Sequence, residues 1–495
     1  MNAPLWRHAA FALSVALLPG ALAAQSGPAL TLQQAVQSAR ESNPDFLQTA
    51  NDLRTARSAT RAARWDLLPT ANASSSLGYT ASGEARSGTY QLAASQPAFY
   101  TSGYSASLNY QLSGSKLLAT SVARAQQAAT QQRIAGSEAN LVGQVVQQYL
   151  SVLQAQEQVA QAEREVGRTA EHVRLAQARL QVGAGTPLDL RQAEVQKGQA
   201  DVKLLQQRAA LETERLKLGQ VMGAPLAPGT QLTSRFELFQ PRWAADSLVQ
   251  IATRNNPTVL AARASVAASR TQIRSARTAY LPTLSMRVGV DGYAQRSGDE
   301  TGVYNQALAG AQSSYAACQR DNLINQAIGV APRVCGSNPS DAAYQSALRG
   351  LISDQNGKFP FRYTRQPLGA QFVVSLPVFS GASRQHQVEE ARVGAEDAEL
   401  QVRSLELRLQ AEISAATLNL NTAYSTAQLQ AQVKQKAAEE LRLAQERFRY
   451  GAANSIDVTD AQTSLALAEQ SEIDAIYNFH KSLAALEALI GQPLR

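Results

Sequence analysis

Residues 442–461 of the chain read RLAQERFRYGAANSIDVTDA, and residues 174–193 read RLAQARLQVGAGTPLDLRQA. Both stretches combine a helix end, a tight reversal and a new helix start. The glycine in each, Gly183 or Gly451, suits the left-handed conformation that closes a helix, and an aspartate six residues later favours the positive end of the next helix. The flanking segments are long, rich in Ala, Gln, Glu, Arg and Leu, and free of proline. Each stretch is therefore predicted to form the tip of a long helical hairpin.

A second set of matching segments indicates that the chain is one duplicated unit. Asn43-Pro44 recurs as Asn256-Pro257, and Leu68-Pro69-Thr70 recurs as Leu281-Pro282-Thr283. The spacing between these copies is smaller than the spacing between the two tips, so the second copy carries extra residues between its matching parts. Internal repetition of this kind marks a repeated structural unit. The predicted organisation is a first repeat at 24–225, a linker at 226–243, and a second repeat at 244–495 with a loop insertion at about 297–367.

The N-terminal residues predict export. Arg7 and His8 precede the apolar run 9–18, and Ala21-Leu22-Ala23 follows it. A basic start, a short apolar core and an A-x-A end are typical of a secretory signal peptide. We expect residues 1–23 to be this signal peptide, with cleavage after Ala23 or Ala24. No other stretch approaches the roughly 18 uninterrupted apolar residues of a transmembrane helix.

Segments of alternating polarity separate the predicted helices. They lie near residues 71–80, 104–112, 284–291 and 371–378. Each has one apolar and one polar face, which is typical of membrane β-barrel strands that turn one face to lipid and the other to a wet lumen. Four strands cannot close a barrel, and unpaired strand edges are prohibitive in lipid. Other copies of the chain are therefore expected to complete the sheet.

The sequence offers little support for an enzymatic or a nucleic-acid-binding function. The net charge of +7 is spread over helices with interleaved acids, without a basic run carrying stacking aromatics. His172, His386 and His480 lie on separate helices, and the pair His386 and Glu389, which could serve a metal in a bundle, falls on an Ala- and Gln-rich helix. We expect no enzyme activity, no cofactor, no metal site and no nucleic acid. The alternative function is a soluble periplasmic coiled-coil scaffold or adaptor, which would explain the helices but not the strands.

Together these features resemble the TolC family, the outer membrane channels of efflux pumps and type I secretion systems. The resemblance covers nearly the whole mature chain. It rests on the two Arg-x3-Gly-x5-Asp tips, the Leu-Pro-Thr junctions and Phe379-Ser380-Gly381. It implies a mixed α and β fold in which a homotrimer forms a twelve-stranded β-barrel continued by a periplasmic α-helical barrel. It also implies an outer membrane exit duct, in contact with outer membrane lipid, for substrates delivered by an inner membrane transporter and a periplasmic membrane-fusion adaptor. The transported substrate stays open.

The resemblance also assigns roles to residues at the tips. The expected periplasmic gate consists of Asp457, Asp460, Asp189 and Phe448. The expected adaptor-docking positions are Arg179, Gly183, Gly185, Arg447, Gly451 and Ser455. Where the family's best-known gate has an arginine and a tyrosine, this chain has Ala453 and Phe448. Closure is therefore expected to use other contacts, through Arg447, Arg449 or Arg191.

Cys318 and Cys335, the only cysteines, lie in the insertion between the third and fourth strands. Because an exported chain passes through an oxidising compartment, we expect a disulfide between them. In the family's topology this insertion is extracellular. Many relatives carry a lipid on an N-terminal cysteine, and the lack of a cysteine near the cleavage site leads us to expect none here.

Overall fold

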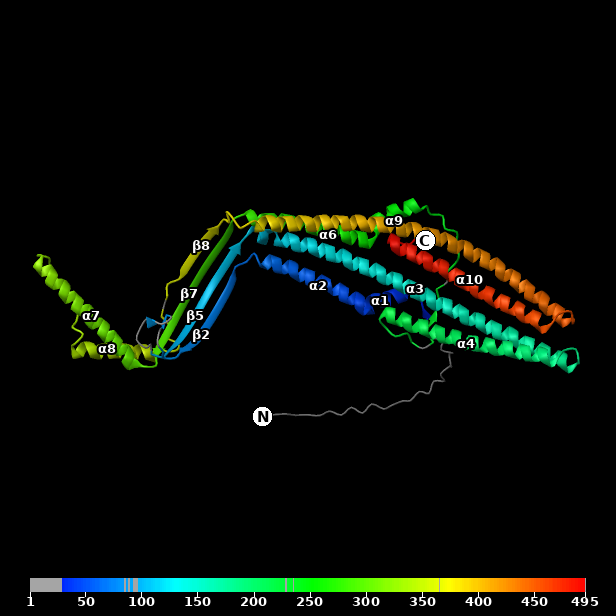
Figure 1. Ribbon diagram of the computed structural model, residues 1–495, viewed down its shortest axis with the longest axis horizontal. Coiled ribbons are helices and arrows are strands. Elements are labelled where there is room, and N and C mark those ends of the chain that lie inside the picture. The colour runs from blue at the N-terminus through cyan, green and yellow to red at the C-terminus, as the bar shows by residue number, and fades with distance from the viewer. Residues whose placement is uncertain are drawn as a thin grey trace, which may run out of the picture. The chain divides into compact units, whose positions relative to one another are not determined.

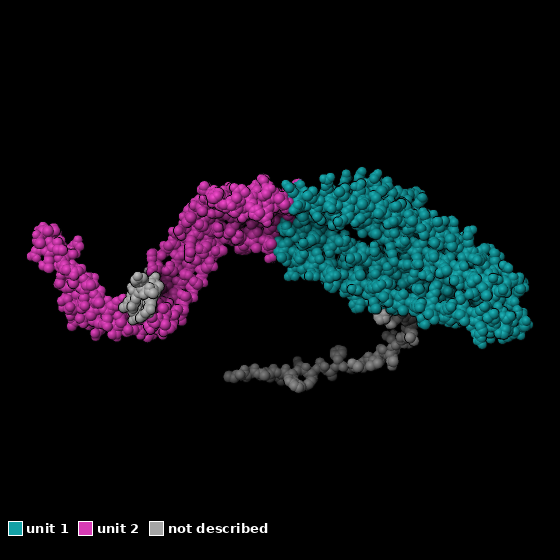
Figure 2. Space-filling model, in the orientation of Figure 1, with its two compact units in different colours: residues 1–56, 126–267, 396–495 teal, residues 57–125, 268–395 magenta. Residues whose placement is uncertain are grey.

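A computed structural model of the chain describes residues 29–83, 86–87, 90–91, 97–227, 229–234, 236–364 and 366–494. The predicted signal peptide, residues 1–23, lies outside these ranges. The chain divides into two compact units (Figure 2). Unit 1 comprises residues 1–56, 126–267 and 396–495, and unit 2 comprises residues 57–125 and 268–395.

The order of helices and strands in the first half of the chain recurs in the second (Figure 1). The first half contains β1 (Ala29–Leu30), α1 (Leu32–Ser42), α2 (Pro44–Trp65), β2 (Thr70–Thr80), β3 (Arg86–Ser87), β4 (Tyr90–Gln91), β5 (Phe99–Leu112), α3 (Gly114–Gln181) and α4 (Pro187–Met222). The second half contains β6 (Gln231–Leu232), α5 (Ala245–Asn255), α6 (Pro257–Arg277), β7 (Thr283–Ser297), α7 (Glu300–Ala327), α8 (Ala342–Gly357), β8 (Gly369–Ser375), α9 (Ser383–Arg449) and α10 (Ser455–Ile490). The two predicted hairpins are α3–α4 and α9–α10.

The repeated Asn-Pro pair joins two helices and ties them to the end of a third. Asn43 caps α1, and its side-chain amide donates to the Val221 carbonyl at 2.8 Å. Asn256 caps α5 and donates in the same way to the Leu489 carbonyl at 2.8 Å. The proline that follows each asparagine starts the next helix, where its missing N–H is not needed. The two joints therefore have the same construction, as the duplicated sequence predicts.

Unit 1 has apolar cores and polar links between helices of the two halves. One core gathers around Tyr149 and Leu218, and another around Ile413 and Phe479. Between α3 and α10, Arg168 holds Glu469 with both terminal nitrogens, at 3.1 and 2.8 Å. A partly buried charge pair that is bidentate is specific in geometry, so it fixes the alignment of the helices as well as their contact.

Unit 2 contains an antiparallel sheet in the order β2-β5-β7-β8. Its register places Thr70, Asn109, Arg287 and Gln371 in one row across the four strands. The neighbouring row holds Tyr110, Met286 and Phe372. Successive residues of a strand point to opposite faces, so one face of the sheet is polar and the other apolar. Among the described residues, no helix has the length and apolar character that crossing a membrane requires.

The structure corrects two expectations in this unit. The last strand ends at Ser375, whereas the alternation suggested a strand to residue 378, because Pro377 has no N–H to donate to a strand partner. The insertion, expected as a loop, contains the helices α7 and α8. The Sγ atoms of Cys318 in α7 and Cys335 lie 2.01 Å apart as a disulfide. Beside it, the Asn322 side chain accepts from the Arg333 N–H and donates to the Arg333 carbonyl, both at 2.6 Å.

Candidate functional site at the hairpin tips

The two tips have the same backbone turn. Gly183 and Gly451 have φ of 74° and 77°, in the left-handed region that glycine adopts without strain. In each tip the residue after the glycine forms a hydrogen bond with the helix that ends there. The Ala184 N–H donates to the Arg179 carbonyl and the Ala452 N–H donates to the Arg447 carbonyl, both at 2.8 Å. This is the Schellman arrangement, which satisfies the last carbonyl groups of a helix.

The helices that follow the tips start with reciprocal caps. The Asp189 carboxylate accepts from the Thr186 N–H at 2.9 Å and from the Thr186 hydroxyl at 2.7 Å. This hydroxyl donor is the main reason why the pKa of Asp189 lies below its ordinary value. Asp457 accepts from the Asn454 N–H at 3.1 Å in the equivalent cap. Asp457 is nonetheless exposed, as is Asp460 one turn further along α10.

An arginine in each tip closes its own turn. Arg179 donates from Nη2 to the Ala184 carbonyl at 2.8 Å, and Arg447 donates from Nη2 to the Ala452 carbonyl at 3.4 Å. Of these two arginines, Arg179 is the one that also contacts the other hairpin among the described residues. Its guanidinium carbon lies 4.4 Å from the centre of the Phe448 ring, a distance at which a cation is attracted to the aromatic face.

We call the residues that join the two tips the inter-tip cluster: His172, Arg179, Asp189, Phe448 and Ser455. Phe448 is 3% exposed and Ser455 is fully buried. The Ser455 hydroxyl donates to the Asp189 carbonyl at 3.4 Å and lies 3.3 Å from His172 Nε2. The His172 ring centre lies 5.5 Å from that of Phe448. A cation–π contact, an aromatic contact and hydrogen bonds therefore connect α3–α4 with α9–α10.

His172 is the titratable group at the centre of this cluster. It is 4% exposed, and burial lowers its pKa from the ordinary 6.5 because a buried site penalises the charged imidazolium. The Asp189 carboxylate acts in the opposite direction but more weakly. The neutral imidazole is therefore the form that the closed cluster favours.

The structure brings some of the sequence-predicted site residues together and leaves others apart. Arg179, Asp189, Phe448 and Ser455 meet, whereas Asp457 and Asp460 stay at the exposed start of α10. The closing contacts expected through Arg447, Arg449 or Arg191 stay a prediction. In the single chain, two of these arginines bond to groups close to them in sequence. Arg447 caps its own turn, and Arg191 pairs with Glu194 at 2.7 Å.

His172 is the member of the cluster that the sequence did not reveal as a site residue. It lies seven residues before Arg179 on α3, so the two side chains share one face of the helix. That spacing is the only signal, and it is weak, because many pairs on a long helix share it. The glycines Gly183, Gly185 and Gly451 shape the turns and carry no side chain into the cluster.

The described residues do not gather three or more His, Cys, Asp or Glu side chains around a point that could hold a metal ion. Glu389, considered above with His386, instead pairs with Arg392 at 3.1 Å.

Comparison with known proteins assigns the family. A family model described as outer membrane efflux protein matches residues 35–224 and 344–492. The chain is 30% identical over 183 residues to the outer membrane efflux protein BepC of Brucella suis biovar 1, covering 37% of this chain and 39% of BepC. It is 26% identical over 159 residues to the cobalt-zinc-cadmium resistance protein CzcC of Cupriavidus metallidurans, covering 32% and 38% of the two chains. These alignments thus span well under half of either curated relative.

The fold is also that of a solved channel. A crystal structure of CusC, described by its conformational changes on folding and transmembrane channel formation, superposes with a TM-score of 0.67 at 16% identity. The match covers 93% of this chain and 92% of CusC. The chain belongs to the outer membrane efflux protein family, which confirms the resemblance to TolC-type proteins and the outer membrane location that it implies.

Proposed function

We propose that the chain forms, as a homotrimer, the outer membrane exit duct of a tripartite efflux pump or a type I secretion system. A periplasmic adaptor docks at the hairpin tips, and an inner membrane transporter supplies both the energy and the substrate. The duct itself carries out no chemistry. The observation that carries the proposal is the sheet of unit 2, whose two faces differ and whose two edges are open.

Both edges of the sheet expose backbone groups that need partners in lipid. Every residue of β2 and of β8 is exposed, and within the described part of the chain each of these strands has a sheet neighbour on one side only. Unpaired N–H and C=O groups cost several kcal/mol each in a bilayer, so an isolated sheet of this kind is excluded there. Pairing β2 of one copy with β8 of the next removes both edges. Repeating this step until the ring closes is the arrangement that we propose.

The apolar face of the sheet has the height of a membrane. Tyr100 and Tyr110 lie on the same face of β5, ten residues apart. Ten residues of antiparallel strand extend about 34 Å, and a tilt of about 40° reduces this to a height of about 25 Å. That is the height of the apolar band between the aromatic girdles of outer membrane barrels.

Two helices of unit 1 carry exposed apolar stripes that indicate further contacts between copies. On α4 the stripe repeats every seven residues, at Leu188, Val195, Val202, Ala209 and Leu216. On α9 it comprises Leu400, Leu407, Leu418, Leu429, Val433 and Leu443. A seven-residue apolar repeat is the seam of a coiled coil. Both stripes are solvent-exposed in the single chain, and pairing α4 of one copy with α9 of another would bury them.

The test is the oligomeric state of the detergent-extracted protein. Native mass spectrometry should give a mass of three copies. Val195→Glu combined with Val202→Glu places charge in the α4 stripe and should lower the temperature at which the trimer dissociates. Ala210→Glu is the matched control, because this exposed position lies about 100° around the helix from the stripe. A stable monomer of the unmodified protein would refute the proposal.

A further inference from the structure

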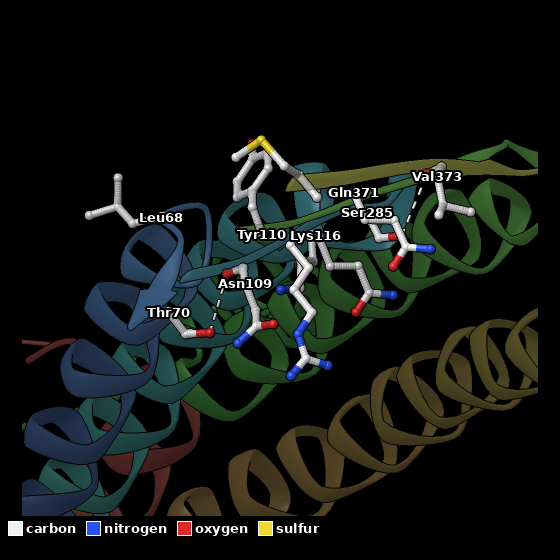
Figure 3. A pocket seen from close by; sticks show the side chains of 11 residues that line it. Leu68, Thr70, Asn109, Tyr110, Lys116, Ser285, Gln371 and Val373 are labelled. Atoms are coloured by element: carbon white, nitrogen blue, oxygen red, sulfur yellow. Dashed lines mark hydrogen bonds between the residues drawn. The ribbon is translucent and has the colours of Figure 1, made fainter. Parts of the chain in front are cut away.

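A recess lies where the strands of unit 2 meet the helix α3, and the polar residues in its lining suit an anionic ligand. The recess has a volume of about 360 Å³ and includes Thr70, Asn109, Gln111, Lys116, Arg287 and Gln371 in its lining (Figure 3). We propose that it binds organic anions that carry a carboxylate, with Arg287 as the group that holds the charge. The anion-binding proposal rests on the proposed function in one respect only. If the polar face of the sheet lines the conduit, the recess favours anionic cargo.

The strand register assembles the recess. Arg287 in β7 lies directly between Asn109 in β5 and Gln371 in β8, and Thr70 in β2 continues the row. Residues in one row share one face of the sheet. Figure 3 shows Asn109 and Tyr110 on opposite sides of their strand, so the tyrosine belongs to the apolar face. The row thus presents one guanidinium flanked by two amides, all of which are hydrogen-bond donors.

The charge of Arg287 is not compensated within the sheet. The strands β2, β5 and β8 contain no acidic residue, and β7 contains only Asp291. Asp291 lies four residues along the strand from Arg287, a separation of about 13 Å. Among the residues that the structure describes, no ion pair or hydrogen bond engages the exposed Arg287 guanidinium.

Assembly of copies into a ring would not compensate the charge of Arg287. The strand that another copy would add beside β8 is β2, and β2 brings no carboxylate. The second cation of the recess differs, because Lys116 Nζ already lies 3.3 Å from Asp66 Oδ1. Arg287 is therefore the group left to bind an anion.

The donor set favours a carboxylate over a simple halide. A guanidinium presents two parallel N–H donors that match the two oxygens of a carboxylate, and it stays charged at all ordinary pH values. The amides of Asn109 and Gln371 lie on either side and supply further donors. A cationic solute would meet an unpaired positive charge at the same place, so the recess discriminates by sign.

The experiment uses the full-length protein and phthalate, a planar dicarboxylate, as the probe. Arg287→Gln removes the charge and should weaken phthalate binding to the detergent-solubilised protein about tenfold, measured by isothermal titration calorimetry. Arg296→Gln is the matched control, because Arg296 is exposed on the same strand but nine residues away and hence on the other face. It should bind phthalate as the unmodified protein does. Equal binding by all three proteins would overturn the proposal.

Planar-bilayer recordings test the consequence for transport. In a potassium chloride gradient, Arg287→Gln should shift the reversal potential toward cation preference, and Arg296→Gln should leave it in place. Arg287→Lys keeps the charge and should retain the reversal potential while binding phthalate more weakly, since the two-pronged donor is lost. An Arg287→Lys protein with the reversal potential of Arg287→Gln would contradict a role for charge. If none of these proteins conducted, the result would contradict the proposed exit duct but not the anion site, because the binding experiment does not depend on conductance.

Discussion

His172 makes the contact between the two hairpin tips sensitive to pH. Because its pKa in the folded protein lies below the ordinary 6.5, the unfolded chain binds the proton more readily. Stability contributed by the neutral imidazole is complete above pH 6.5. It falls as the pH drops below that value, until the buried group is itself protonated. Acid therefore weakens the inter-tip cluster.

The prediction is that His172→Gln makes the tips less sensitive to acid. Between pH 8 and pH 5.5 the unmodified protein should lose protection of tip amides in hydrogen exchange, whereas the variant should lose less. Gln cannot gain a proton in this range but can still form a hydrogen bond with Ser455. His386→Gln is a suitable control, because His386 lies in α9 outside the tips. An equal acid response in the unmodified and His172→Gln proteins would contradict the assignment.

The tip residues show what the sequence could and could not reveal. Gly183, Gly451 and Asp189 act in turns and caps, which depend on neighbours along the chain, so local sequence was sufficient to identify their positions. The contact of Phe448 with Arg179 joins residues far apart in sequence and depends on how two hairpins pack. For the same reason Phe448, expected at the gate, is buried between the tips in this structure. Asp457 and Asp460 keep their predicted role as a proposal.

The helices and strands were predictable to different degrees. The long helices are marked by extended proline-free segments between recognisable caps, and the central strands by alternating polarity. The helices α7 and α8 escaped prediction because the insertion offers no clear apolar periodicity, being rich in Ala, Gln, Ser and Asn. The predicted end of β8 was too late, because the alternation of apolar and polar residues continues beyond Pro377 whereas strand pairing does not.

The disulfide provides a test of the insertion. Replacing both Cys318 and Cys335 by serine should make the segment after α7 more susceptible to trypsin, with faster cleavage at Arg333. Closing a loop of this size stabilises by about 3 kcal/mol in the chain-entropy model, although the Asn322 side chain still holds the Arg333 backbone. Limited proteolysis followed by mass spectrometry measures the rate. Unchanged cleavage in the double variant, with cleavage elsewhere also unchanged, would show that the disulfide does not restrain the segment.

Assembly of three chains, as proposed, would give the exposed acids at the tips a collective role. Asp457 and Asp460 from three copies would place six carboxylates around the entrance, and this clustering of like charges would concentrate negative potential there. We predict a duct whose entrance prefers cations and is blocked by multivalent cations, which oxygen ligands hold well. Asp457→Ala with Asp460→Ala should abolish the block and reduce the preference for cations while leaving the trimer intact.

Planar-bilayer recordings measure both properties. Glu439→Ala with Glu440→Ala removes the same number of charges from exposed positions of α9, about three turns before the tip glycine, and serves as the control. This pair should leave the block unchanged. A double aspartate variant that is still blocked by multivalent cations would exclude a gate formed by these residues. The expected shift is opposite in sign to that of Arg287→Gln, so the two positions can be distinguished in one series of recordings.

The pairing of β5 with β7 has a consequence for the order of folding. The register joins Phe99 to Ser297, so the four-stranded sheet cannot be completed until the second half of the chain has been made. Each helical hairpin, in contrast, closes through neighbouring residues, and local contacts form faster than distant ones. The first helical hairpin should therefore be in place while the edge of β5 that pairs with β7 is still open and prone to aggregation. Until residues 283–297 are available, the open edge of β5 would need a holding factor, and the duration of that dependence should increase with any delay in translating these residues.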